Sequence, residues 1–166
     1  MRFKKIFLVL ISTFLLVIPA SAQSDEDETV KIVYQCDFPD VKRVHFMLNT
    51  LGNVVKYYQK KFIDFELDVV FLGPGLQYMM KDFKGTGYAR KPYLTHGGPT
   101  GKGTKDRFDN LKATGGDSVN FYVCKNTMKK KNVKAEQIDD KAEIVPAGVI
   151  KIVELQQEGA AYIKIK

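Results

Sequence analysis

Two cysteines are the residues of this chain with the most distinctive chemistry. Cys36 ends the apolar run "KIVYQC", and Cys124 ends the run "NFYVC" just before Lys125, Asn126 and Thr127. Asn126 or Thr127 can begin a helix there, and a helix N-terminus beside a lysine favours the reactive thiolate form of a cysteine. A free cysteine is also a common small, buried apolar residue. Residue types alone therefore leave open a structural or a reactive role for Cys124.

Several other positions follow apolar runs in the same way as the cysteines. Gly73 and Gly75 flank a proline after "DVVFL", where backbone N–H groups could bind an anion, although a tight turn explains these glycines more simply. Asp37 follows Cys36 and could act as a local acid or base, but a turn residue is the simpler account. Pro146 and Gly148 follow "AEIV" and could form the wall of a small pocket.

The residue spacing does not require a metal site or a hydrolytic triad. His45 and His96 are far apart in the sequence and do not show the spacing of a zinc site. No Ser-His-Asp arrangement and no pair of catalytic carboxylates can be argued. We expect no bound metal ion and no cofactor.

The elements that carry these residues alternate between strand-like and helix-like patterns. This alternation predicts an α/β fold of three layers, α/β/α, with a mainly parallel five-stranded sheet and the last strand at an edge. In such sheets, sites gather at the carboxyl ends of the strands. We expect the helix over 149–159 to turn Val149, Ile152, Val153 and Leu155 inward. The expected strands are 29–36, 65–72, 118–124, 142–148 and 160–166, and the expected helices are 39–62, 76–83, 106–116, 126–133, 135–140 and 149–159.

The predicted sheet places Cys36 and Cys124 at the same edge. In the common strand order 2-1-3-4-5 the first and third strands are neighbours, about 4.8 Å apart. That spacing lies near the Cα distance of a disulfide, so the two cysteines can form one or lie just too far apart.

The N-terminus predicts export. Residues 1–22 combine basic residues, an apolar run and a final "ASA", which is typical of a cleaved secretory signal. Residues 23–29 form an acidic leader that we expect to be disordered, and residues 30–166 suit one domain. Residues 84–105 are rich in Gly, Pro, Thr and Lys and predict a long loop, which could be a lid.

The charge pattern excludes some classes of function. The chain carries a net charge of +7, and residues 1–22 account for three basic and no acidic residues, which leaves +4 after cleavage. Acidic residues are interspersed with the basic ones, so the pattern is not that of a nucleic-acid-binding protein. No later apolar run is long enough to span a membrane. We expect a periplasmic or secreted protein without stable membrane insertion.

Three stretches resemble the DsrE/DsrF-like family. The stretch "FYVCKNTMKKKNV" is similar to the region around the sulfur-accepting cysteine of that family. "VVFLGPGLQYM" and "EIVPAGVIKIVELQQEGAAYI" add to the resemblance, which covers residues 31–165. The chain differs from the well-studied sulfur carriers in its signal sequence and in having "KKKNV" where an Arg-Gly pair often follows.

The resemblance implies a role in sulfur handling. By position, Cys124 matches the cysteine that accepts sulfane sulfur as a persulfide, and Cys36 would be a resolving or disulfide partner. Family members form homo-oligomers or pair with related subunits, whereas the sulfur donor and acceptor are not implied. Whether this chain is a sulfurtransferase or only a carrier stays open. The alternative is a non-catalytic binding or assembly domain in which both cysteines are a structural disulfide or buried thiols.

Overall fold

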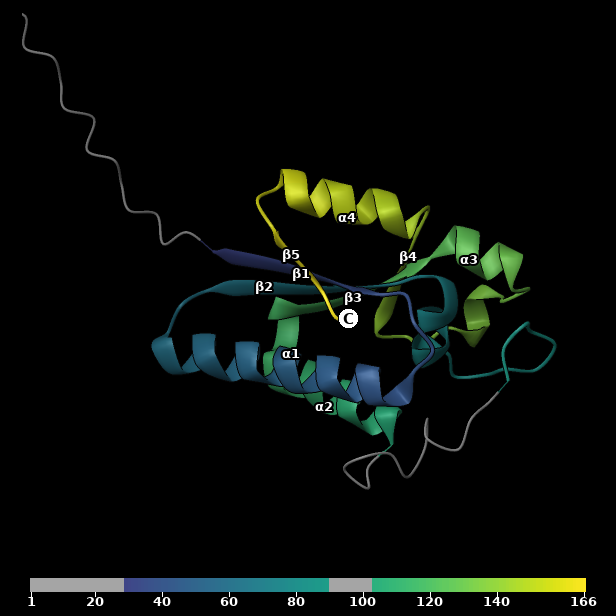
Figure 1. The fold of residues 1–166 in the computed structure, drawn as a ribbon, viewed down its shortest axis with the longest axis horizontal. Helices are drawn as coiled ribbons and strands as arrows, with labels where there is room; N and C mark the ends of the chain where they lie inside the picture. The colour runs from purple at the N-terminus through teal and green to yellow at the C-terminus, as the bar shows by residue number, and fades with distance from the viewer. Residues whose placement is uncertain (1–28, 90–102) are drawn as a thin grey trace, which may run out of the picture.

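The computed structural model describes residues 29–89 and 103–166 (Figure 1). The predicted signal segment, the leader up to residue 28 and the central part of the predicted loop lie outside the described residues. Among the helices that are described, none is both long and apolar enough to cross a membrane.

A five-stranded parallel sheet forms the centre of the molecule, in the order β4-β3-β2-β1-β5. The prediction of an α/β fold with a parallel five-stranded sheet and the last strand at an edge is therefore confirmed. The strands are β1 (Val30–Cys36), β2 (Phe65–Phe71), β3 (Val119–Cys124), β4 (Ala142–Val145) and β5 (Ala161–Lys164).

Helices cover both faces of this sheet (Figure 1). α1 and α2 lie on one face and α4 lies on the other, while α3 and η1 lie near the end where the strands finish. The α-helices are α1 (Val41–Lys61), α2 (Thr104–Gly115), α3 (Lys125–Lys130) and α4 (Gly148–Gln157), and the 3₁₀ helices are η1 (Gly73–Met79), η3 (Gly116–Ser118) and η4 (Ala135–Gln137). The helix predicted over 76–83 is thus a 3₁₀ helix that begins three residues earlier.

The larger core lies between the sheet and the α1–α2 layer. Side chains of a strand alternate between its two faces, so Phe71 of β2 and Phe121 of β3 both point to this layer and meet Phe108 of α2. The three rings contact one another edge to face, with centroids 5.3 to 5.9 Å apart. This interlocking holds α2 against the two central strands.

The strand order differs from the 2-1-3-4-5 order considered from the sequence. β2 lies between β1 and β3, with Cys36 opposite Phe71 and Phe71 opposite Val123. Two strand spacings amount to about 10 Å, which exceeds the Cα range of a disulfide. Both cysteines are free thiols. The expectation that Cys36 and Cys124 lie on neighbouring strands is therefore wrong.

The exposed face of α4 also differs from the prediction. Ile152 and Leu155 are buried as expected, but Val149 is 59% exposed and Val153 is 45% exposed. Among the described helices, α4 packs on this side of the sheet without a neighbouring helix beside it, so only one sector of its surface is covered. With Ile150, these two valines leave an apolar stripe on the outer side of α4.

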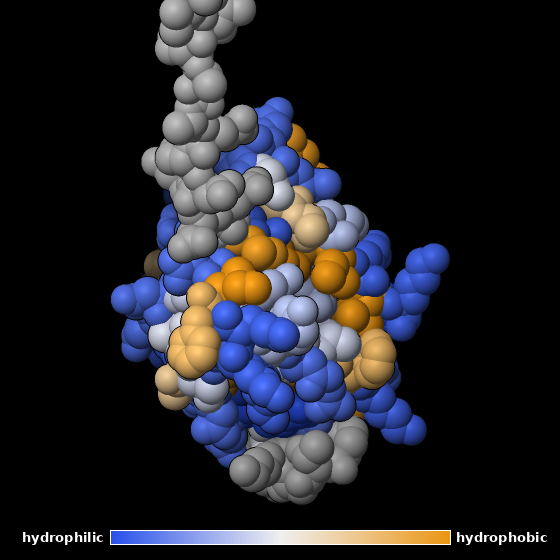
Figure 2. Space-filling view, turned by 90° about the vertical axis from the view of Figure 1, so that its left-hand side faces the viewer, coloured by the Kyte–Doolittle hydropathy of each residue, from blue (hydrophilic) through white to orange (hydrophobic). Residues whose placement is uncertain are grey.

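Apolar side chains also lie open at the end of the sheet where the strands begin. Phe62, which follows α1 in a left-handed backbone conformation with φ of 55°, is 95% exposed, and Ile63 is 41% exposed. Figure 2 views this end and shows hydrophobic surface at its centre, surrounded by hydrophilic residues. This end is opposite to the one that carries Cys124.

Candidate functional site

Cys124 is the last residue of β3 and directly precedes α3. The apolar alternation of "VNFYVC" makes a central strand, and the polar residues that follow allow the chain to turn into a helix. The predicted position of Cys124 at the carboxyl edge of the sheet is confirmed. The residue is buried at this edge, with 6% of its surface exposed.

Hydrogen-bond donors surround the sulfur of Cys124. Burial by itself raises the pKa of the thiol, but the Thr127 hydroxyl and the backbone N–H groups of Gly148, Thr127 and Asn126 outweigh it and lower the pKa below its ordinary value. Donors that stabilise the charged form of a buried group favour that form. We call these donors and the sulfur they surround the thiolate cradle.

The Thr127 hydroxyl can donate to the Cys124 sulfur while its oxygen accepts a hydrogen bond from a backbone N–H. The backbone N–H of Gly73 donates to Thr127 Oγ1 over 3.0 Å. The hydroxyl hydrogen is then free to point toward Cys124. Gly73 has a φ of 49°, a left-handed conformation that glycine adopts without strain. The Gly-Pro-Gly turn therefore contributes to the site by orienting the Thr127 hydroxyl.

Tyr88 lies beside the cradle, a position that no sequence pattern predicted. Its hydroxyl donates to the Gly73 carbonyl over 2.6 Å. Burial, followed by the charge of Cys124, raises the pKa of Tyr88 to about 12, so the phenol stays protonated. Lys131 Nζ lies 5.5 Å from the centre of the Tyr88 ring. Because Tyr88 belongs to an irregular segment, no periodic pattern could have indicated its position.

Two glycines allow close packing at this edge of the sheet. A Cβ on Gly148 would lie 3.2 Å from the Cβ of Cys124 and 3.2 Å from Cγ1 of Val70. A Cβ on Gly75 would lie 2.1 Å from the carbonyl oxygen of Cys36, which real structures do not tolerate. Gly148 thus brings its N–H close to the sulfur, and Gly75 lets η1 pack on the end of β1.

Three other predicted residues lie outside the cradle. Lys125 and Pro146 are exposed and line a neighbouring cavity of about 430 Å³ with Met128 and Ile144. The Asp37 carboxylate instead accepts hydrogen bonds from Gln35 Nε2, over 2.7 Å, and Lys164 Nζ, over 3.3 Å. These partners belong to β1 and β5, on the other side of β2 from Cys124.

Cys36 is a structural thiol. It is fully buried, and burial followed by the charge of Asp37 raises its pKa far above its ordinary value. A neutral thiol that solvent cannot reach is a poor nucleophile. Together with the intervening strand β2, this contradicts the expectation that Cys36 resolves or pairs with Cys124.

Within residues 29–89 and 103–166, no group of three or more His, Cys, Asp or Glu side chains is placed to hold a metal ion. His45 is buried in α1 and hydrogen-bonds Thr104 Oγ1 through Nε2 over 2.9 Å. His96 lies outside the described residues.

Comparison with known proteins gives a family and a fold. The model of the DsrE/DsrF-like family matches residues 44–165. No curated protein matches the chain. Among solved structures, the protein of unknown function MTH1491 from Methanobacterium thermoautotrophicum is similar, with a TM-score of 0.62 and 21% identity over 81% of this chain and 98% of that one. The ychN protein from E. coli is also similar, with a TM-score of 0.54 and 14% identity over 82% of this chain and 100% of that one.

Proposed function

Because the chain belongs to the DsrE/DsrF-like family, we propose that it relays sulfur, with Cys124 accepting a sulfane sulfur as a persulfide and passing it on. The chain acts in this proposal as a carrier rather than as an enzyme that completes a reaction alone. The family match supports a link to sulfur relay in general, and the geometry of Cys124 supports the persulfide.

The thiolate cradle is the observation that carries this proposal. A cysteine that only filled space would need no donors, and burial would leave it a neutral thiol. Here the Thr127 hydroxyl and three backbone N–H groups favour the thiolate. The same donors suit the negative charge of a persulfide, whose terminal sulfur is ionised more readily than a thiol.

The proposed transfer needs no external oxidant. The Cys124 thiolate attacks the outer sulfur of thiosulfate or of a polysulfide, and a new S–S bond forms as the bond inside the donor breaks. The leaving group, sulfite or a polysulfide one sulfur shorter, takes the bonding electron pair. An acceptor thiolate then attacks the outer sulfur of the persulfide and regenerates the Cys124 thiolate.

A non-catalytic domain with two buried thiols is the second candidate function. The 6% exposure of Cys124 favours it, because a relay needs a sulfur that reagents can reach. The variant of this alternative that relied on a Cys36–Cys124 disulfide is overturned by the strand order.

Mass measurement on the reduced protein separates the two candidates. We expect polysulfide treatment of wild type to add the mass of one sulfur atom, which dithiothreitol removes. Cys124→Ser should lose this gain, whereas Cys36→Ser should keep it because Cys36 is inaccessible. A wild-type protein that stays folded and gains no sulfur from polysulfide or thiosulfate would refute the relay and support the buried-thiol alternative.

We also propose that the protein assembles with itself or with a related subunit, and that it is periplasmic or secreted. A homo-oligomer or a complex with a related subunit is supported by the exposed apolar stripe on α4, formed by Val149, Ile150 and Val153. A periplasmic or secreted location is supported by residues 1–22 of the sequence alone.

A further inference from the structure

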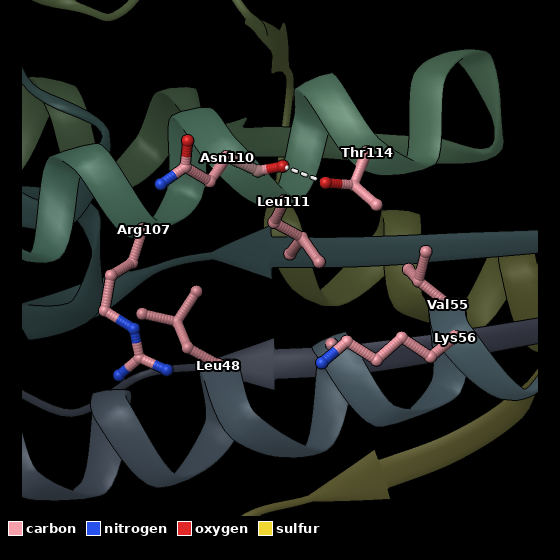
Figure 3. Close-up of a pocket in the computed structure, with 8 residues that line it drawn as sticks. Leu48, Val55, Lys56, Arg107, Asn110, Leu111 and Thr114 are labelled. Atoms are coloured by element: carbon pink, nitrogen blue, oxygen red, sulfur yellow. Dashed lines mark hydrogen bonds between the residues drawn. The ribbon is translucent and has the colours of Figure 1, made fainter. Parts of the chain in front are cut away.

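A groove runs between α1 and α2 (Figure 3). These two helices lie on the face of the sheet that α4 does not cover (Figure 1). Hydrogen bonds join the two helices at both ends of it. At one end Arg107 donates to Asn49 Oδ1 over 2.7 Å and to the carbonyl of His45 over 3.3 Å. At the other end Gln59 Nε2 donates to the carbonyl of Thr114 over 2.8 Å. Between these ties lies a cavity of about 170 Å³.

Gly52 opens this groove without being required by the fold. It lies in the middle of α1, where glycine is less favourable than alanine because it loses more backbone freedom. Its backbone is ordinary helix, and a Cβ built on it would meet nothing within 4 Å. Neither close packing nor backbone conformation explains the glycine, and its effect is to leave the groove open.

The lining of the groove combines an apolar floor with two cations. Leu48, Val55 and Leu111 are buried and form the floor. In Figure 3 the Arg107 side chain extends from α2 toward α1, whereas the Lys56 side chain lies along α1 at the edge of the groove. Among the salt bridges of the described residues, none involves Lys56 or Arg107.

The position of Arg107 makes an anion favourable at this groove. The guanidinium hydrogen-bonds only neutral oxygens in the part of the chain described, and burial lowers its pKa. A partly desolvated cation gains more from an anionic partner than one in bulk water. An apolar group of the ligand would also remove from water the apolar surface that the floor still exposes, which is favourable.

We propose that this groove is a binding site for a small aromatic carboxylate, the benzoate class of ligand. The groove is open to solvent, but its volume of about 170 Å³ gives room for one aromatic ring, since an enclosed engineered cavity of about 150 Å³ holds benzene. The ring would cover Leu48, Val55 and Leu111, and the carboxylate would pair with Lys56 and Arg107. The proposal involves no residue of the thiolate cradle, so it stands or falls independently of the sulfur relay.

Amide NMR titration of the ¹⁵N-labelled protein tests this site with two probes, sodium benzoate and neutral benzamide. A ligand of nine heavy atoms on a shallow groove should bind with a Kd on the order of 1–10 mM. We expect benzoate to bind at least threefold more tightly than benzamide and to shift amides of residues 48–56 and 107–114. Equal affinity for the two probes, or shifts elsewhere, would overturn the assignment.

Two variants with a matched control locate the ligand. Gly52→Leu should fill the groove and abolish the saturable shifts without lowering the melting temperature, because leucine favours a helix more than glycine does. Lys56→Gln should weaken benzoate binding at least threefold and leave benzamide unchanged. Lys60→Gln removes the same charge one turn later, outside the groove, and should bind as wild type. Loss of binding in Lys60→Gln, or retention in Gly52→Leu, would show non-specific attraction and refute the site. Cys124→Ser should bind benzoate normally.

Discussion

Replacing Thr127 by valine should make Cys124 a weaker thiolate while leaving its position unchanged. Valine has nearly the shape of threonine but lacks the hydroxyl, which is one of four donors that lower the pKa of Cys124. A hydrogen bond to a charged group contributes about 1.5–3 kcal/mol, and each 1.4 kcal/mol is a factor of ten. At a pH below the titration of the thiol, the thiolate fraction should therefore fall roughly 10- to 100-fold.

The rate of alkylation should fall less than the thiolate fraction. A more basic thiolate is intrinsically more nucleophilic, with a Brønsted coefficient of about 0.4–0.5, and so recovers about half of the loss on a logarithmic scale. We expect iodoacetamide to modify Cys124 about 3- to 10-fold more slowly in Thr127→Val, with the pH–rate profile displaced to higher pH. Cys36 is fully buried and should not contribute to the measured rate.

Thr127→Ser provides the control, because it keeps the hydroxyl and should keep both the rate and the profile. Thr127→Val also leaves the Gly73 N–H without its acceptor, which should cost about 1–3 kcal/mol of stability in urea unfolding. A folded Thr127→Val protein with the pH–rate profile of wild type would refute the view that this hydroxyl stabilises the thiolate.

Two further predictions test the surroundings of the site and the acid stability of the fold. Gly148→Ala places a methyl group 3.2 Å from the Cβ of Cys124. We expect slower alkylation of Cys124 and a free energy of unfolding in urea that is about 1–3 kcal/mol lower. An unchanged rate and an unchanged free energy would show that β3 can shift to make room for the methyl group. Burial raises the pKa of Asp139, but hydrogen bonds from Lys105 and Lys141 outweigh this and lower it from 3.8 to about 2. The resulting stability is present above the pKa of the unfolded chain, near 3.8, and is lost as the pH falls toward 2. On acidification, the free energy of unfolding of Asp139→Asn should therefore fall by about 2 kcal/mol less than that of wild type. Asp140→Asn changes a side chain that is 89% exposed and should respond to acid as wild type does.

Local patterns predicted the elements and the edge of the sheet at which Cys124 lies. Apolar alternation followed by polar residues is enough to place a cysteine at the end of a strand and before a helix. The strand order was not accessible in this way, because it depends on which strands pack together across long separations. That order decides the role of Cys36, since the insertion of β2 between the cysteines turns a possible partner into a core residue.

The thiolate cradle and the residues that contact it were predicted only in part. Asn126, Thr127, Gly73 and Gly148 were candidates, but the contact that joins Gly73 to Thr127 depends on a left-handed backbone that the sequence only permits. Tyr88 was missed because its segment has no periodicity.

The pairing of β5 with β1 has a consequence for the order of events during synthesis. β1 is the first strand to be made and β5 the last, yet the two are neighbours in register from Ile32 opposite Ala161. Arg43, just after β1, also hydrogen-bonds the carbonyl of Ile165, the penultimate residue. One edge of β1 therefore has no neighbour until β5 has been synthesised, so this sheet can be completed only after the other four described strands have been made. If the protein is exported, as we propose from residues 1–22, this late completion of the sheet would keep the chain unfolded for longer before it crosses the membrane.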